Sequence, residues 1–285
     1  MDKSNVLVIG PGAVGIGIAV LVARAGHNVQ LLGRSGPLGN GRLSFGEVTR
    51  EASFNTAEDF MPHLAIITSK AYDLKSIVAN YLGIFNRCES VLCLQNGLGI
   101  RESVPELKNF VQGVLYVSAE RRSVNEAYWW IRMKIVLDKN DPKSEKVGAL
   151  LAEAGIDIDR TADFGEAVFR KLIINIALNP VSTIYRYSSK QIAENAPARE
   201  RAYAAAREVQ KIGEAAGVTF RHSSDDIVKS MLDRGNDFHS SMLQDLEANR
   251  PLEIETILEE PLRVAARNGI AVPEITSLRN DLMKR

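Results

Sequence analysis

The chain has 285 residues, a length that suits two domains better than one compact core. Hydrophobic residues make up 45% and charged residues 25%, an ordinary balance for a globular protein. The 35 basic residues balance the 35 acidic ones, so no net field attracts nucleic acid or an anionic membrane, and an anion would need a local site.

Cysteine, histidine and terminal patterns exclude several further classes. Cys88 and Cys93 lie too close together to cross-link much of the chain, and neither they nor the histidines show metal-ligand spacing. The N-terminus lacks the apolar core and cleavage site of a signal peptide, and no run approaches the roughly 18 apolar residues that span a bilayer. Basic patches interleaved with aromatic residues are also missing. We expect a cytoplasmic protein without a metal, membrane or nucleic-acid partner.

The first part of the chain alternates between strand and helix patterns. Residues 5–9 form an apolar run, GPGAVG turns the chain into a helix-forming stretch, and residues 28–34 are typical of a second strand. Further strands are predicted over 64–68 and 90–97, with a helix over 71–85 between them. This alternation predicts a parallel sheet with crossover helices.

The pattern changes after this sheet. Within residues 113–137, VLYVSA and AYWWIRMKIVL predict antiparallel strands that close the edge of the sheet, followed by a helix near 143–154 and a strand around 155–160. We place an α/β domain at 1–162 and a helical domain at 163–285. The predicted helices of the second domain cover residues 164–179, 190–195, 197–216, 223–232, 252–268 and 274–284.

The turn after the first strand has the G-x-G-x-x-G pattern of a dinucleotide-binding loop. It consists of Gly10, Pro11, Gly12, Ala13, Val14 and Gly15. The first glycine makes the tight turn, the second lets the backbone approach a pyrophosphate, and the third allows close packing of helix and strand. The helix that follows supplies N–H donors and a partial positive charge. We predict dinucleotide binding here; the alternative is a merely structural tight turn.

The residue after the second strand indicates which nicotinamide cofactor is preferred. An acid at this place would accept a hydrogen bond from the ribose 2′-hydroxyl, whereas this chain has Gly33, Arg34 and Ser35. A guanidinium suits a 2′-phosphate, so Arg34 favours NADP (NADPH) over NAD. The alternative is that Arg34 is simply a solvated loop residue.

A polar stripe crosses the apolar stretch KLIINIALNP. Lys171, Asn175 and Asn179 follow one another at steps of four, so they drift by only about 80° around an α-helix and share one face. The stripe either faces a substrate in a cleft between the domains, or Lys171 extends to solvent while the asparagines are satisfied in the core. The stripe alone favours neither interpretation.

Four further stretches complete a pattern together with GPGAVG. They are TSKAYD around Lys70, LQNGLG around Asn96, FRKLIINIALNP around Lys171, and SSMLQDLEANRPLEIE from Ser240 to Glu255. In this order they resemble the ketopantoate reductases (2-dehydropantoate 2-reductases) over nearly the whole chain. The resemblance implies an α/β fold with an N-terminal Rossmann domain and a C-terminal all-helical domain like that of 6-phosphogluconate dehydrogenase. It also implies NADPH-dependent reduction of 2-dehydropantoate to (R)-pantoate, a step toward pantothenate and coenzyme A.

The resemblance also implies roles for single residues. Lys171 would be the general acid, and Glu253 a cleft carboxylate that contacts the cofactor or orients the substrate. Asn96 would lie near the nicotinamide and the substrate, and Lys70 near the cofactor phosphate. The implied substrate contacts are Asn96, Asn175, Asn179 and Ser241. Without the resemblance, the serine pair before MLQD is equally well explained as a simple helix N-cap.

The chain departs from the family pattern in two places. The segment after residue 116 lacks the family's hydroxyl-rich and glycine-rich portion and carries Trp129 and Trp130, and Ser189 stands near the place of a frequent asparagine. The alternatives are therefore a related 2-keto acid or opine-type reductase with an altered pocket, or an inactive NADP-binding sensor. Helical substrate domains of such enzymes often pair, which leaves a homodimer open.

Overall fold

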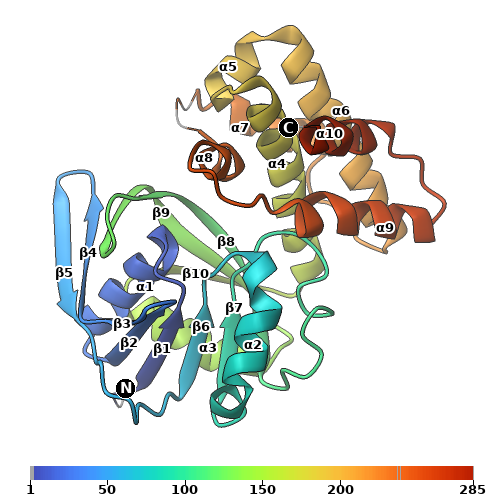
Figure 1. Cartoon of the computed structure of the whole chain (residues 1–285). Coiled ribbons are helices and arrows are strands. Elements are labelled where there is room, and N and C mark those ends of the chain that lie inside the picture. Colours follow the sequence, from blue (N-terminus) through green and yellow to red (C-terminus); the bar gives the residue numbers. More distant parts are fainter. Residues whose placement is uncertain (1–2, 236, 238, 285) are drawn as a thin grey trace. The chain divides into compact units, whose positions relative to one another are not determined.

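The computed structural model describes residues 3–235, 237 and 239–284. By their contacts, the residues form two compact units (Figure 1). The first unit consists of Met1–Gln95 and Ile100–Phe164, and the second of Asn96–Gly99 and Gly165–Arg285. The short segment Asn96–Gly99 thus belongs with the helical unit, although the chain on both sides of it belongs to the first unit.

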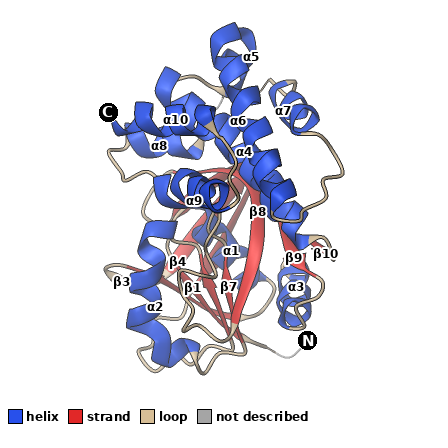
Figure 2. Ribbon diagram, turned by 90° about the vertical axis from the view of Figure 1, so that its right-hand side faces the viewer, coloured by secondary structure: helices blue, strands red, loops and turns tan. Residues whose placement is uncertain are grey.

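The centre of the first unit is a parallel sheet of buried strands. The strands are β1 (Asn5–Ile9), β2 (Asn28–Gly33), β6 (Leu64–Ile67) and β7 (Ser90–Cys93), paired in the order β2-β1-β6-β7. Their apolar runs reflect burial on both faces. Helices α1 (Ala13–Arg24) and α3 (Lys143–Glu153) cover one face, and α2 (Ala71–Phe85) covers the other (Figure 2). The predicted Rossmann-type arrangement is confirmed.

The long hairpin after β7 continues the sheet instead of closing it. β8 (Phe110–Arg121) pairs in parallel with β7 and antiparallel with β9 (Glu126–Asp138), as an antiparallel hairpin should. The predicted place at the sheet edge is wrong, because β9 also pairs in parallel with β4 (Asn40–Phe45) and β10 (Asp157–Thr161). The strand order is therefore β3-β2-β1-β6-β7-β8-β9-β4-β5, with β3 (Gly36–Leu38) and β5 (Val48–Ser53) at the two ends and β10 on β9.

The strands between residues 36 and 53 have no counterpart in the sequence prediction. β3 (Gly36–Leu38) pairs with β2, while β4 forms an antiparallel hairpin with β5 (Val48–Ser53). Most side chains of β5 are exposed, so this strand lacks the apolar pattern that identifies the others. Its place in the sheet comes from backbone pairing with β4.

The second unit is all-helical and is built around α4 (Phe164–Tyr185). Its other helices are α5 (Ser189–Glu194), α6 (Ala196–Ala215), α7 (Ser224–Leu232), α8 (Ser241–Glu247), the π-helical segment η1 (Glu255–Glu259), α9 (Glu260–Arg267) and α10 (Pro273–Met283). α4 continues through Pro180 beyond the predicted end at residue 179. A proline removes one backbone N–H, and the Thr183 hydroxyl stabilises the next turn by donating to the Asn179 carbonyl at 2.7 Å.

Among the described residues, α4 is also the one helix long and apolar enough to cross a membrane. Lys171, Asn175 and Asn179 interrupt its apolar residues, so α4 passes this test on average composition and holds no continuous apolar run of that length. The most apolar 18-residue window of α4 has a mean hydropathy of 1.2, and 67% of that window is buried inside the structure. Its apolar side chains pack with those of α6 in the core of the helical unit.

Candidate active site

The glycine turn connects β1 to α1, and neighbouring backbone atoms pack tightly against its inner side. Gly10 has a φ of +105°, and an added Cβ there would lie 2.7 Å from the backbone nitrogen of Ser69. The Gly10 carbonyl accepts from the Thr68 hydroxyl and from the Gly12 N–H, each at 2.8 Å. An added Cβ at Gly15 would lie 2.1 Å from the same carbonyl oxygen. The first and third glycines are therefore required for packing.

Gly12 is different, because space remains beside it. Its φ is −79°, which any residue can adopt, and an added Cβ would meet nothing within 4 Å. Gly12 is the N-cap of α1 and makes no side-chain cap, and Ala13 and Val14 begin the helix. Pro11 packs near Gly33, where an added Cβ would lie 3.0 Å from the proline Cγ. The turn thus leaves the approach to the α1 N-terminus open, as a pyrophosphate site requires.

Two buried polar atoms beside the turn have no hydrogen-bond partner among the described residues. They are the Ser69 hydroxyl and the Gln95 Oε1, while the Gln95 Nε2 donates to the carbonyls of Ile67 and Ser69 at 3.0 and 3.1 Å. Unpartnered buried polar groups are rare in native structures, and a bound water, ion or ligand can satisfy them. The polar surroundings of the turn therefore fit a dinucleotide. Sequence reasoning marks neither residue except by its position inside TSKAYD or LQNGLG.

Lys70 and Arg34 both lie close to α2. Lys70 is the N-cap residue of α2, and its carbonyl accepts from the Asp73 N–H at 3.0 Å. Arg34 follows β2, and its side chain is 85% exposed. Its Nη2 donates to the two carboxylate oxygens of Asp73 at 3.0 and 2.9 Å. Arg34 is therefore exposed but held by α2, which neither sequence interpretation anticipated.

Trp129 lies beneath α1 in the first unit. Its indole Nε1 donates to the Ala13 carbonyl at 3.0 Å, and an added Cβ at Gly17 would lie 2.0 Å from the ring. The side chain is 3% exposed, so this departure from the family pattern fills the core and stabilises the first turn of α1. The neighbouring Trp130 is 37% exposed and packs edge-on against Tyr128.

The polar stripe of α4 is largely buried in the helical unit. Asn175 and Asn179 are 6% and 5% exposed, and Lys171 is partly buried. The Asn175 Nδ2 donates to the Asn96 Oδ1 at 3.4 Å, so the structure brings the LQNGLG motif to the stripe. The Asn179 Nδ2 has no hydrogen-bond partner among the described residues and can donate to an oxygen of a substrate.

Lys171 and Glu253 form the charged part of this site. Burial lowers the pKa of Lys171 from its ordinary value to about 8, although the negative charge of Glu253 raises that pKa in part. Glu253 is 5% exposed, whereas Glu255 is exposed and pairs with Arg263 at 2.6 Å. Glu253 is therefore the buried acid of its segment. Because its pKa is about 8, the Lys171 amine can lose and regain a proton near physiological pH.

An irregular helix fixes the loop that carries Asn96. In η1 the Glu260 N–H donates to the Glu255 carbonyl, five residues back, and Pro261 next in the chain has no N–H for the Thr256 carbonyl. That carbonyl accepts instead from the Leu98 N–H at 2.9 Å. The proline thus frees an acceptor that holds the loop beside α4.

Gly97→Ala tests this attachment. Gly97 has a φ of +98°, and an added Cβ would lie 2.2 Å from the Thr256 carbonyl oxygen, so the loop would have to move. We expect the free energy of unfolding to fall by about 3 kcal/mol, from backbone strain and the lost hydrogen bond. The control Gly269→Ala has a φ of +66° but no atom within 4 Å, and should lose only about 1–2 kcal/mol. Equal losses in chemical denaturation would contradict the attachment.

Thr256 belongs to the candidate site, although sequence reasoning did not identify it. Its hydroxyl is buried without a hydrogen-bond partner among the described residues. An added Cβ at Gly97 would lie 2.6 Å from the Thr256 Cβ, which shows how closely the Asn96–Gly99 loop packs here. Nothing in the sequence distinguishes this threonine, because its position depends on the π-helical turn.

Ser240 and Ser241, at the start of α8, have different roles. The Ser240 hydroxyl accepts from the Leu243 N–H at 3.2 Å and is the N-cap, while Ser241 is exposed at the first position of the helix. No hydrogen bond joins Ser241 to the α4 stripe within the described part of the chain. Asp245 is 2% exposed and binds the Arg250 Nε at 2.9 Å, which braces the end of α8. The other departure, Ser189, begins α5 behind a capping box.

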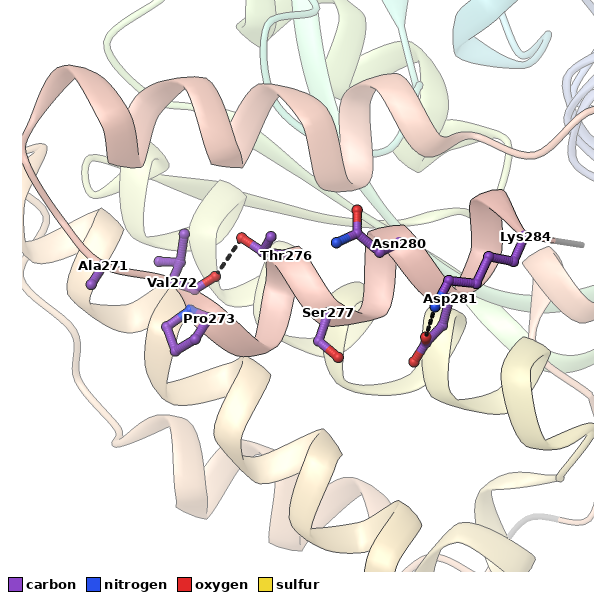
Figure 3. A pocket seen from close by; sticks show the side chains of 8 residues that line it. All are labelled: Ala271, Val272, Pro273, Thr276, Ser277, Asn280, Asp281 and Lys284. Carbon is purple, nitrogen blue, oxygen red and sulfur yellow. Dashed lines mark hydrogen bonds and ion pairs between the residues drawn. The ribbon is translucent and has the colours of Figure 1, made fainter.

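A shallow hollow of about 560 Å³ lies elsewhere in the helical unit, along α10 (Figure 3). Its polar lining comes mainly from Thr276, Ser277, Asn280 and Asp281 on α10, and from Lys284 directly after this helix. None of the candidate site residues lines it. This hollow is therefore separate from the chemistry described above.

Comparison with known proteins agrees with this architecture. The family described as "Ketopantoate reductase PanE/ApbA" matches residues 6–140, and "Ketopantoate reductase PanE/ApbA C terminal" matches residues 163–284. The 2-dehydropantoate 2-reductase of Archaeoglobus fulgidus is 25% identical over 267 residues, covering 90% of this chain and 89% of the relative.

Solved structures show the same fold. D-mandelate dehydrogenase with NADH and anilino(oxo)acetate has a TM-score of 0.87 at 19% identity, covering 98% of this chain and 97% of the other. The dimeric ketopantoate reductase of Staphylococcus aureus has a TM-score of 0.83 at 22% identity, covering 98% of each chain.

Fold and site together define an oxidoreductase built from a Rossmann-type unit and a helical unit. The two family matches cover most of the chain in the expected order. The chain belongs to the ketopantoate reductase family.

Proposed function

We propose that the protein is an NADP-dependent 2-dehydropantoate 2-reductase, which reduces 2-dehydropantoate to (R)-pantoate in the synthesis of pantothenate and coenzyme A. The observation that carries the proposal is Lys171, whose pKa burial lowers to about 8 in the presence of the Glu253 charge. Asn175 and Asn96 lie in the same unit and provide amides for an oxygen-rich substrate. The shared name of curated relatives at about 25% identity supports the same activity.

The reaction adds hydride to a carbonyl carbon and leaves negative charge on the oxygen. A bound nicotinamide dinucleotide supplies the hydride. The Lys171 ammonium stabilises the developing alkoxide and then donates its Nζ proton to it, so that one group has an electrostatic and an acid role. The Glu253 charge keeps a useful fraction of Lys171 protonated against the effect of burial. Amide groups of Asn175 and Asn179 bind substrate oxygens without adding charge.

The first unit provides the cofactor contacts in this proposal. The backbone from Gly12 to Gly15 binds the pyrophosphate at the α1 N-terminus, and Arg34 binds the 2′-phosphate of NADP. Lys70 lies near the cofactor phosphate, and Asn96 near the nicotinamide. The unpartnered Ser69 and Gln95 oxygens beside the turn support a polar ligand there.

The pH dependence of the rate should report Lys171. Reduction needs the protonated amine, so with a pKa of about 8 its kcat/KM should be level at lower pH and fall about tenfold per unit well above pH 8. Oxidation of the hydroxy acid needs the neutral amine and should rise over the same range. Steady-state rates in both directions measure this.

The Glu253→Gln variant provides the control for the pH profile. It removes the charge that raises the pKa of Lys171, so the falling limb should move to lower pH. A limb that stays in place would mean that another group controls the profile.

A related 2-keto acid reductase is the second candidate function. The fold of D-mandelate dehydrogenase is as similar as that of the ketopantoate reductases. Initial rates with 2-dehydropantoate, phenylglyoxylate and small 2-keto acids, each with NADPH and NADH, separate the candidates. Weak turnover of 2-dehydropantoate beside fast turnover of another acid would reject the narrow proposal, and cofactor binding without any turnover would indicate a sensor.

The proposed assembly is a homodimer, the state that the Staphylococcus aureus relative is described to have.

A further inference from the structure

We propose that Asp73 sets the balance between the two nicotinamide cofactors, by competing with the 2′-phosphate of NADP for Arg34. The inference rests on the proposed function in one respect, namely that a nicotinamide dinucleotide binds at the glycine turn. It concerns a residue for which neither the sequence motifs nor the cofactor fingerprint provides a role.

The geometry shows a carboxylate where the fingerprint has none. Enzymes that prefer NAD place an acid at the end of the second strand, where it accepts from the ribose 2′-hydroxyl. Here β2 ends at Gly33 and is followed by Arg34 and Ser35. The Asp73 carboxylate extends from α2 to the guanidinium of Arg34, and both of its oxygens lie within 3.0 Å of the Arg34 Nη2. Another element thus supplies the acid that the strand end lacks.

The two partners are held unequally. Asp73 belongs to the first turn of α2, its N–H donates to the Lys70 carbonyl at 3.0 Å, and its carbonyl accepts from the Ser76 hydroxyl at 2.8 Å. Its side chain is 29% exposed, against 85% for Arg34. The carboxylate is therefore the anchored partner, and the guanidinium is the one that a ligand can draw away.

The two cofactors meet this pair differently. A 2′-phosphate must either displace the Asp73 carboxylate from the N–H groups of Arg34 or bind Arg34 with that negative charge close by. Both weaken the binding of the phosphate. A ribose with a free 2′-hydroxyl can donate to the carboxylate and leaves the ion pair intact. Asp73 therefore lowers the affinity for NADP but not for NAD. The preference for NADP over NAD is then smaller than Arg34 alone would make it.

The test measures dissociation constants for NADPH and NADH by calorimetry or fluorescence at one fixed ionic strength. In Asp73→Asn, the ratio of the two constants should shift about tenfold in favour of NADPH, with NADH binding unchanged or weaker. Exposed ion pairs contribute little to folding, so this variant should keep the circular dichroism spectrum and the Tm of the parent. An unchanged ratio overturns the inference.

Glu89→Gln is the matched control. Glu89 is an exposed carboxylate of the same unit, pairs with Lys146 at 3.0 Å, and precedes β7, at the end of the strands away from the glycine turn. The substitution changes the net charge equally. It should leave the ratio as in the parent protein, and an equal shift there would mean that general charge, not Asp73, sets the preference.

A double-mutant cycle with Arg34→Ala separates competition from simple repulsion. If Asp73 competes for Arg34, the gain from Asp73→Asn should largely disappear when Arg34 is alanine. A gain of the same size would show that the carboxylate repels the phosphate directly, and would overturn the competition. If the parent protein binds neither dinucleotide, the proposed function fails as well; if it binds both and only the ratio is insensitive, this inference alone fails.

Discussion

Lys171→Ala is expected to lower kcat for keto acid reduction at least about 100-fold, the lower end of what a general acid contributes, while NADPH binding is retained. The reason is that one amine both stabilises the charge on the substrate oxygen and provides the proton. Its pKa of about 8 places it where proton donation is effective at physiological pH. Steady-state kinetics for turnover and calorimetry for NADPH binding measure the two effects separately.

The control for this result is Lys190→Ala. Lys190 is an exposed lysine on α5 in the same unit, so its removal changes the net charge equally but should leave kcat within about twofold. Lys171→Arg keeps a positive charge but cannot release a proton near neutral pH, so it should recover little of the rate. A Lys171→Ala variant with the parent kcat would remove the lysine from the mechanism.

Gly12→Ala is expected to weaken NADPH and NADH binding about 100-fold or more without loss of stability. The free protein has room for the methyl group, since φ is −79° and no atom lies within 4 Å of an added Cβ. The same space is where a pyrophosphate must approach the backbone, so the methyl group should collide with the ligand alone. Fluorescence titration and thermal unfolding measure the two properties.

Gly83→Ala is the matched control for this glycine. Gly83 lies in α2, where an added Cβ also meets nothing within 4 Å, so the variant should be at least as stable as the parent and bind cofactor normally. If Gly12→Ala keeps full affinity, the turn is structural only. That outcome would favour the alternative interpretation of the G-x-G-x-x-G pattern.

The sequence predicts an element well where its own pattern determines the structure. The helix over 71–85 has the predicted bounds, because a regular apolar face is followed by polar residues that end it. In contrast, β4 and β5 are rich in polar residues and are defined by pairing. The sequence pattern predicts an edge position for the hairpin of β8 and β9, because it cannot show that β4, far earlier in the chain, pairs with β9.

The candidate site follows the same division. Spacing of four predicts that Lys171, Asn175 and Asn179 share a helix face. The LQNGLG motif identifies Asn96 as a candidate site residue before the structure is known. The role of Thr256 depends on a carbonyl freed by Pro261 and on a loop from a distant part of the chain. The pairing of Arg34 with Asp73 likewise joins two motifs that sequence reasoning treats separately.

The grouping of Asn96–Gly99 with the helices has a consequence for how this protein can be divided. A fragment that begins at Gly165 would contain every helix of the second unit except the first residue of α4, yet would lack the Leu98 N–H for the Thr256 carbonyl. One polypeptide cut cannot release an intact helical unit, because its residues come from two separate stretches of chain. The helical unit is therefore complete only when the Asn96–Gly99 segment is supplied together with the helices.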